Sequence, residues 1–134
     1  MNTFEQHLEI TKKHLDDLQH VNNVQYLQWV QDIAGAHWQQ LIKGKAQTFG
    51  LWVVRSHHIE YKRQVKLGDR LRVVTHVEVT EGFQSERHVR FFLNNTTTLV
   101  VHCRTQWCYL DAQSHRLMRI PIEIHKLFEK EPSK

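Results

Sequence analysis

The sequence predicts an α+β fold in which one long helix lies on an antiparallel sheet. Two observations support this prediction. Between residues 23 and 42, apolar residues recur at spacings of three and four, as in an amphipathic helix of about five turns. After residue 50, strand-like runs follow one another with short turns between them, and short turns require antiparallel neighbours. A chain of 134 residues has the length of a single domain, so we assign residues 1–134 to one domain.

The helix has a recognisable start and one unusual residue. Asn22 is expected to cap it by accepting a backbone hydrogen bond on its side-chain oxygen, with Gln25 completing a capping box. Gly35 lies inside the helix, where glycine costs about 1 kcal/mol relative to alanine. Close packing of the helix against a sheet would explain this glycine.

The strand-like runs lie on both sides of the helix. They cover residues 3–12 before it and residues 51–65, 71–79, 85–93, 98–110 and 117–120 after it. Gly82 and the pair Asn94–Asn95 mark turns between them. The third run alternates regularly, so four residues are expected to share one face: Leu71, Val73, Val77 and Val79. Residues 122–130 are expected to form a short terminal helix.

The composition is that of an ordinary globular domain, with 40% hydrophobic and 24% charged residues. No apolar run approaches the ~20 residues of a membrane-spanning helix, and the N-terminus lacks the apolar stretch of a signal peptide. We therefore expect a cytoplasmic protein that does not associate with membranes. Cys103 and Cys108 have an odd spacing, which places them on opposite faces of one strand, so no disulfide is expected.

The net charge of +4 favours an acidic partner, such as nucleic acid, an acyl carrier protein or a phosphorylated carrier like coenzyme A. No nucleic-acid-binding motif accompanies the charge, so nucleic acid is not an expected partner. The eleven histidines are scattered without the spacing of a metal site. Neither a metal ion nor another cofactor is therefore expected.

Polar chemistry is concentrated directly before the helix. The run from Asp16 to Gln25 holds two acids, a histidine and two asparagines. Its segment DDLQHVNNVQY (16–26) resembles the D-x-x-x-H-V-N-N-x-x-Y signature of hotdog-fold acyl-thioesterases of the 4-hydroxybenzoyl-CoA thioesterase type. Two later segments resemble other parts of that family: HHIEYKRQVKLGDRLRV (57–73) its second and third strands, and WCYLDAQSHRLMRIP (107–121) its last strand pair and R-x-x-x-I-P ending.

The resemblance implies a hotdog fold, with a long central helix wrapped by a five- to six-stranded antiparallel sheet. It also implies a homodimer, or a dimer of dimers, with two sites at the subunit interface that act on thioesters of coenzyme A or acyl carrier protein. Two positions depart from the patterns. Gln64 stands where the family usually has proline. Leu18 stands where plant-type acyl-carrier-protein thioesterases often have asparagine, so their version of the catalytic network is not carried over.

The resemblance assigns roles to three residues before the helix. Asp16 aligns with the family's catalytic carboxylate and would act as general base or nucleophile. A slip of one residue in the alignment would exchange it with Asp17. His20 would orient the carboxylate or the water, or donate a hydrogen bond to the thioester. Asn23 is a candidate for substrate contact, and the free N–H groups of the helix start could bind the developing negative charge.

The acyl group and the carrier need their own residues. Candidates for lining an apolar acyl slot are Tyr26, Leu51, Trp52 and Tyr61. Candidates for the phosphates of coenzyme A are Arg55 and Arg63, within a basic cluster that also holds Lys62, Lys66 and Arg70. Backbone near Gly50–Trp52, contributed across the dimer, could supply a second donor to the thioester oxygen.

Three functions remain open at this point. The first is an acyl-CoA thioesterase that releases a free acid and coenzyme A, with no cofactor beyond the coenzyme A of the substrate. The second is a thioesterase of acyl carrier protein, whose acidic face would suit the same basic cluster. The third is a hotdog module that binds acyl groups without turnover.

Overall fold

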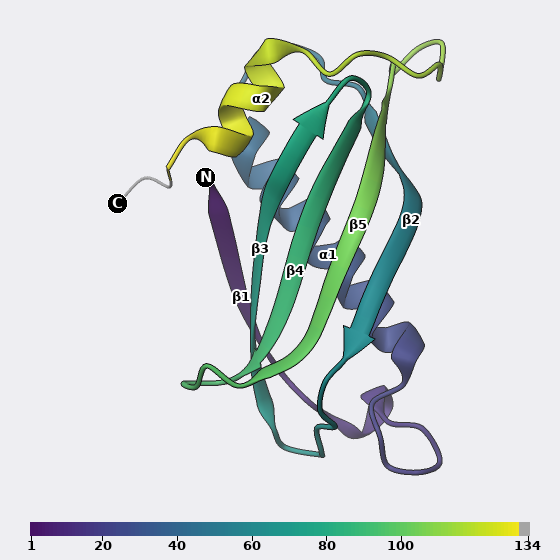
Figure 1. Cartoon of the computed structure of the whole chain (residues 1–134), viewed down its shortest axis with the longest axis vertical. Helices are drawn as coiled ribbons and strands as arrows, with labels where there is room; N and C mark the ends of the chain where they lie inside the picture. The colour runs from purple at the N-terminus through teal and green to yellow at the C-terminus, as the bar shows by residue number, and fades with distance from the viewer. Residues whose placement is uncertain (132–134) are drawn as a thin grey trace.

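The computed structural model describes residues 1–131, in which one antiparallel sheet covers a long helix (Figure 1). The sheet has five strands in the order β1-β3-β4-β5-β2. They are β1 (Thr3–Glu9), β2 (Leu51–Tyr61), β3 (Arg70–Glu81), β4 (Gln84–Leu93) and β5 (Leu99–Leu110). Every neighbouring pair is antiparallel. The predicted α+β class is confirmed, with the lower of the two expected strand numbers.

The long helix, α1 (Asn23–Ile42), starts as the sequence predicts. The N–H of Val24 donates to the side-chain oxygen of Asn22 at 2.9 Å. The capping box is not completed, because Gln25 contributes only its backbone N–H to the carbonyl of Asn22. Twenty residues make a helix about 30 Å long, which is enough to run along the whole sheet.

Two apolar clusters fill the space between α1 and the sheet. The first surrounds Tyr26, Val30 and Ile33 in the first half of the helix and includes Val89 and Phe91 of β4. The second surrounds Trp38 in the last half of the helix. Its other buried members are Val77, Tyr109, Ile120, Ile124 and Phe128. The core is therefore divided along α1, and each half of the helix has its own apolar partners.

A short helix, α2 (Ile122–Glu129), covers the second cluster, and the predicted terminal helix is thus confirmed. Its exit lies beside the start of the chain (Figure 1). The N–H of Asn2 donates to the carbonyl of Phe128 at 2.8 Å, and the Asn2 amide donates to the carbonyl of Lys130 at 2.7 Å. The two ends of the described chain are therefore joined by hydrogen bonds.

The expected strand over residues 117–120 is wrong. Leu117 forms one isolated bridge with Leu110, and the chain then leaves β5. The N–H of Ile120 donates to the carbonyl of Gly82 at 2.8 Å, in the turn between β3 and β4. The segment therefore crosses the end of the sheet instead of pairing along it. The predicted runs 3–12 and 51–65 are each too long, since β1 ends at Glu9 and β2 at Tyr61.

Val79 does not share the buried face of β3. Its side chain is 51% exposed, whereas Leu71, Val73 and Val77 are buried as predicted. The register between β3 and β4 shifts between Val77 and Val79. Such a β-bulge inserts an extra residue and turns the following side chain to the other face.

Strand β2 is an edge of the sheet, because it pairs only with β5. Its pairing shifts between Val54 and Ser56. Three of its large apolar or aromatic side chains are exposed: Leu51, Val53 and Tyr61. No helix among residues 1–131 is both long and apolar enough to cross a membrane. Cys103 and Cys108 both lie in β5 and are free and buried.

Candidate active site

A tight loop presents Asp16 at the start of α1. Leu15 and Val21 pair through an isolated antiparallel bridge that closes the loop. Within it, the N–H of Asp16 donates to the carbonyl of His20 at 2.8 Å, and the N–H of Gln19 donates to the carbonyl of Asp16 at 3.0 Å. Gln19 has a φ of 63°, the left-handed conformation that reverses the chain here.

The carboxylate of Asp16 is held by main-chain donors. Its Oδ1 accepts the N–H of Leu18 at 2.9 Å and the N–H of His20 at 3.1 Å. Its Oδ2 has no hydrogen-bond partner among residues 1–131. One oxygen is therefore fixed while the other remains available. A carboxylate held in this way can accept a proton from water or attack a carbonyl carbon.

Most of the predicted site residues surround one cavity of about 450 Å³. They are Asp16, His20, Asn23, Tyr26, Tyr61 and Arg63. Gln64 stands where the family that the sequence resembles usually has proline, and it lines the same cavity. Asp17, the alternative produced by a slip of one residue, is exposed and does not line it. The structure thus brings the motif before α1 together with the end of β2.

Two tyrosines form one wall of this cavity. The rings of Tyr26 and Tyr61 meet edge to face, with centroids 5.8 Å apart. Burial, with a smaller contribution from Tyr61, raises the pKa of Tyr26 to about 12. Burial also raises the pKa of Tyr61. Both hydroxyls are therefore neutral at physiological pH and able to donate hydrogen bonds.

The other predicted substrate-binding residues lie elsewhere. Leu51 and Trp52, at the opposite end of β2, line a second and larger cavity of about 650 Å³. Arg55 is exposed in the middle of β2 and lines neither cavity. The rest of the predicted basic cluster is exposed as well, and Lys62 is paired with Glu60 at 2.8 Å. Within one chain, the predicted residues thus divide between the two ends of β2.

The predicted backbone donor at Gly50 already has a partner in this chain. Its N–H donates to the hydroxyl of Tyr109 at 2.6 Å. A Cβ at this position would lie 2.2 Å from the carbonyl oxygen of Leu110 and 2.8 Å from the ring of Tyr109. Only glycine therefore allows the chain to approach β5 so closely here.

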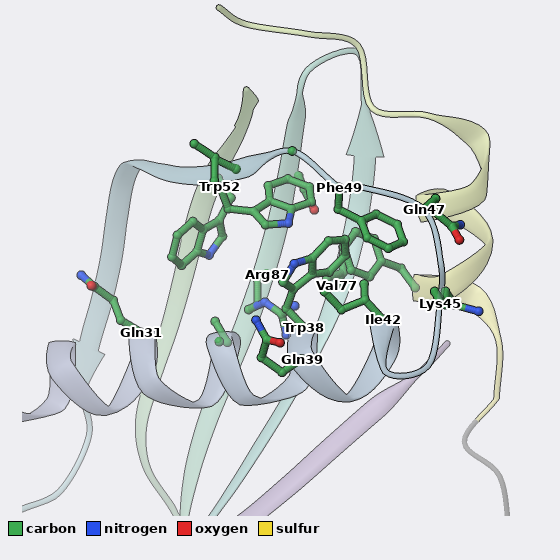
Figure 2. Close-up of a pocket in the computed structure, with 17 residues that line it drawn as sticks. Gln31, Trp38, Gln39, Ile42, Lys45, Gln47, Phe49, Trp52, Val77 and Arg87 are labelled. Carbon is green, nitrogen blue, oxygen red and sulfur yellow. The ribbon is translucent and has the colours of Figure 1, made fainter. Parts of the chain in front are cut away.

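The larger cavity contains residues that the sequence analysis missed. Figure 2 shows Trp38, Phe49 and Trp52 around it, with Arg87 beneath them. Arg87 lies on the inward face of β4, two residues from the inward Ser85 and Val89. The alternation of β4 was the available signal, because it places position 87 on the side that faces α1.

Gly35 also lines the larger cavity, and the expected explanation for it is wrong. A Cβ built on Gly35 would meet nothing within 4 Å, so no strand packs closely against it. Instead, the missing side chain widens the cavity. Among residues 1–131, no group of three or more histidine, cysteine or acidic side chains is arranged to hold a metal ion.

Residues 10–128 match the thioesterase-like superfamily. The chain belongs to this superfamily. The match covers the loop of Asp16, α1 and the strands β2 to β5. The resemblance to thioesterases that the motifs predict is therefore confirmed at the level of the family. The expected enzyme class, a hydrolase of thioesters, is confirmed at the same level. No curated protein shows a significant match to this sequence.

Solved structures of similar proteins share the fold. YbaW from Escherichia coli, named a probable thioesterase, is 18% identical with a TM-score of 0.80, covering 93% of this chain and 96% of that one. Slr0204 from Synechocystis, a 1,4-dihydroxy-2-naphthoyl-CoA thioesterase, is 13% identical with a TM-score of 0.78, covering 94% and 95%. SAV2348 from Staphylococcus aureus, solved in complex with CoA, is 13% identical with a TM-score of 0.81, covering 98% and 87%. The predicted hotdog fold is confirmed.

Proposed function

We propose that this thioesterase hydrolyses acyl-CoA thioesters in the cavity beside the start of α1, with Asp16 as general base or nucleophile. The observation that carries the proposal is the carboxylate of Asp16, with Oδ1 held by two main-chain N–H groups and Oδ2 free. The carboxylate lies in a cavity with His20 and Asn23. As general base it would take a proton from the water that attacks the thioester carbon. As nucleophile it would attack that carbon itself, expel the thiolate of coenzyme A and form an anhydride that water then hydrolyses.

The start of α1 supplies a donor for the thioester oxygen. The N–H of Val24 is used by the Asn22 cap, and the N–H of Gln25 by the Asn22 carbonyl. The N–H of Asn23 has no partner among residues 1–131. It lies at the positive end of the helix, where negative charge is stabilised. His20 would orient the carboxylate or the attacking water in the same cavity.

The divided substrate residues support a homodimer in which two copies of β2 pair along their free edges. Antiparallel pairing about a two-fold axis at the middle of β2 places Leu51 of one chain opposite Tyr61 of its partner. Each complete site would then combine the Asp16 cavity of one chain with the aromatic cavity of the other. The exposed Leu51 and Val53 on this edge are side chains that such a contact would cover.

The cavities and the similar proteins support coenzyme A as the carrier and an aryl or alkyl acyl group. SAV2348 was solved in complex with CoA, and Slr0204 is a 1,4-dihydroxy-2-naphthoyl-CoA thioesterase. Trp38, Phe49 and Trp52 line a cavity suited to an aryl or alkyl chain. Arg63, in the smaller cavity, is the candidate for a phosphate of coenzyme A.

The test is thiol release from short, medium, long and aryl acyl-CoA thioesters by the wild type and by Asp16→Asn. We expect Asp16→Asn to lower kcat by about a hundredfold or more while the melting temperature is retained. Asp17→Asn is the matched control, because it removes a neighbouring exposed carboxylate and should keep wild-type turnover.

Each contrary outcome of this test points to a different function. Turnover of acyl carrier protein thioesters alone would replace coenzyme A as the carrier. Binding of acyl groups without turnover on either carrier would favour the non-catalytic module. Equal losses in Asp16→Asn and Asp17→Asn would remove Asp16 from the chemistry.

A further inference from the structure

The aromatic cavity contains a charge that the proposed reaction does not use. The cavity lies between the last half of α1, residues 45–50, the start of β2 and α2 (Figure 2). Trp38 lines it between two other aromatic rings, with ring centroids 5.4 Å from Phe49 and 5.5 Å from Trp52. Beneath these rings lies Arg87, whose side chain is only 4% exposed.

The partners of Arg87 within the chain are neutral. Its Nη1 lies 2.8 Å from Nδ1 of His37 and 3.1 Å from the hydroxyl of Thr75. The other ring nitrogen of His37 lies 2.7 Å from the amide oxygen of Asn2, which can only accept. His37 therefore carries its proton on Nε2 and accepts from Arg87 on Nδ1. Burial and the charge of Arg87 lower the pKa of His37 to about 3, so the ring is uncharged.

In the described part of the chain, no carboxylate pairs with Arg87. None of the salt bridges among residues 1–131 includes it. The residues around the cavity include two cations, Arg87 and Lys45, and no aspartate or glutamate. Burial lowers the pKa of Arg87 only to about 10, which leaves it charged at neutral pH. A buried charge without a counter-ion is costly to maintain, and an anion entering the cavity would relieve that cost.

Unused donors face the same space. Two of the five N–H groups of a guanidinium bind His37 and Thr75, and Nε and Nη2 of Arg87 have no partner among residues 1–131. They are not among the fully buried unpartnered atoms, so they are open to the cavity that Arg87 lines. The indole N–H of Trp107, another lining residue, also has no acceptor among residues 1–131, but it is fully buried and not open to the cavity. The cavity thus combines apolar walls with donors that lack acceptors.

We propose that the aromatic cavity is a binding site for an apolar carboxylic acid, whose carboxylate accepts from Nε and Nη2 of Arg87 while its body lies among the aromatic rings. A carboxylate matches the donor geometry of a guanidinium. The site goes beyond the proposed function, which requires no anion here. Within one chain it lies away from Asp16, since Tyr26 and Trp38 are separated by about 18 Å of α1, whereas in the proposed dimer it would adjoin the Asp16 cavity of the other chain.

The site has a consequence for the proposed reaction. A thioester hydrolase releases a carboxylic acid. An acid bound at Arg87 occupies the cavity that would receive the next acyl group, so the released acid would compete with the substrate for this cavity. This consequence rests on the proposed function, whereas the binding itself does not.

Calorimetric titration of 2-naphthoate and of the uncharged 2-naphthamide tests the proposal on the whole chain. We expect the wild type to bind the acid at least about tenfold more tightly than the amide. Arg87→Met should abolish this preference. Arg104→Met is the matched control, because it removes the same charge from an exposed position of β5 and should bind as the wild type does.

A second variant tests the cavity without altering Arg87. Gly35→Leu places a side chain into the cavity from a position with no atom within 4 Å of its Cβ, and it should weaken naphthoate binding by about tenfold or more. If Arg87→Met does not fold, Gly35→Leu and the acid-over-amide preference of the wild type decide the question.

Three results would overturn the proposal: equal wild-type affinity for acid and amide, an acid preference retained in Arg87→Met, or unchanged binding by Gly35→Leu. The readout is binding rather than turnover. Failure here therefore leaves the hydrolase proposal standing, and failure of the Asp16 test leaves this one standing.

Discussion

Asp16 is oriented by the main chain that follows it, not by another side chain. The N–H groups of Leu18 and His20 both donate to one carboxylate oxygen, and the turn at Gln19 brings them into reach. Asn22 then starts α1 with its own side chain. A substitution of Leu18 therefore leaves these bonds in place, because only its backbone N–H is used. The departure from the plant-type pattern at Leu18 is compatible with an intact Asp16.

Gly35 provides a test at the residue scale. Gly35→Ala should raise the free energy of unfolding by about 1 kcal/mol, because alanine is the better helix former and the added methyl meets nothing within 4 Å. The melting temperature should rise by about 3–5 °C in calorimetry. Gly50→Ala is the contrasting variant, since its Cβ would overlap the carbonyl oxygen of Leu110 and should destabilise the fold. A lower melting temperature for Gly35→Ala would contradict the open space that the structure shows beside Gly35.

At the scale of elements, the outer face of the sheet carries a row of stacked histidines across three strands. His76 of β3 stacks on His88 of β4, with centroids 5.3 Å apart, and His88 stacks on His102 of β5 at 5.0 Å. Nδ1 of His88 lies 2.8 Å from Nε2 of His102. The cross-strand register sets this row, because His76 pairs with His88 and each strand presents alternate residues to the outer face.

The surroundings of this row oppose protonation of two of its members. Burial, followed by the nearby charges of His88 and Arg90, lowers the pKa of His76 despite its bond to Glu78 at 2.6 Å. Burial, followed by Arg90 and His88, lowers the pKa of His102 despite Glu60, and Arg104 acts in the same direction as burial. Glu86 accepts from the other ring nitrogen of His88 at 3.1 Å.

These lowered pKa values predict a loss of stability in acid. The unfolded chain, with histidine pKa near 6.5, binds more protons than the folded chain below that pH. The free energy of unfolding should therefore fall as the pH decreases below about 6.5, by up to about 1.4 kcal/mol per pH unit for each proton of difference. Urea unfolding between pH 7.5 and 5 measures this slope. His102→Gln should reduce the slope, whereas His115→Asn, in an exposed turn, should not.

An unchanged slope in His102→Gln would assign the acid sensitivity to other groups. One other buried histidine, His37, also has a lowered pKa, of about 3. Because this value lies below the measured pH range, His37 adds equally to the slope of the wild type and of His102→Gln. The difference between wild type and His102→Gln therefore isolates the row on the outer face.

The elements themselves could largely be predicted from the sequence, and the failures have local causes. The helix period, the Asn22 cap and the turn pair Asn94–Asn95 are signals within a few residues, and all three hold in the structure. Residues 117–120 read as a strand, yet they cross the sheet end because their partner is the carbonyl of Gly82. Val79 was misplaced because a bulge has no sequence signature in a regularly alternating run.

At the scale of the whole molecule, the same contrast separates the two cavities. The smaller cavity could be predicted, because its residues lie in two short segments, 16–26 and 61–65, that carry motifs. Of the larger cavity only Leu51 and Trp52 could be predicted, because its other residues come from α1, the loop before β2, β3, β4, β5 and α2 without a motif. Strand register brings Ser85 opposite Trp107, and register is not visible in a single sequence.

The proposed dimer makes the strongest prediction at this scale, because each site would use both chains. Gly35→Leu fills the acyl slot from a position on α1 with nothing within 4 Å of its Cβ, so it should abolish turnover without unfolding the chain or altering the β2 edge. Asp16→Asn is inactive for a different reason. In a mixed dimer, the intact Asp16 of one chain meets the unfilled cavity of the other, and one of the two sites is complete. Mixing the two inactive variants in equal amounts should therefore restore about one quarter of wild-type turnover after subunit exchange.

The double variant carrying both substitutions, mixed with Asp16→Asn, is the control and should stay inactive. Mixed dimers that form, as native mass spectrometry would show, yet remain inactive would mean that each site lies within one chain, and a wild type that is monomeric at full turnover would exclude the shared site altogether.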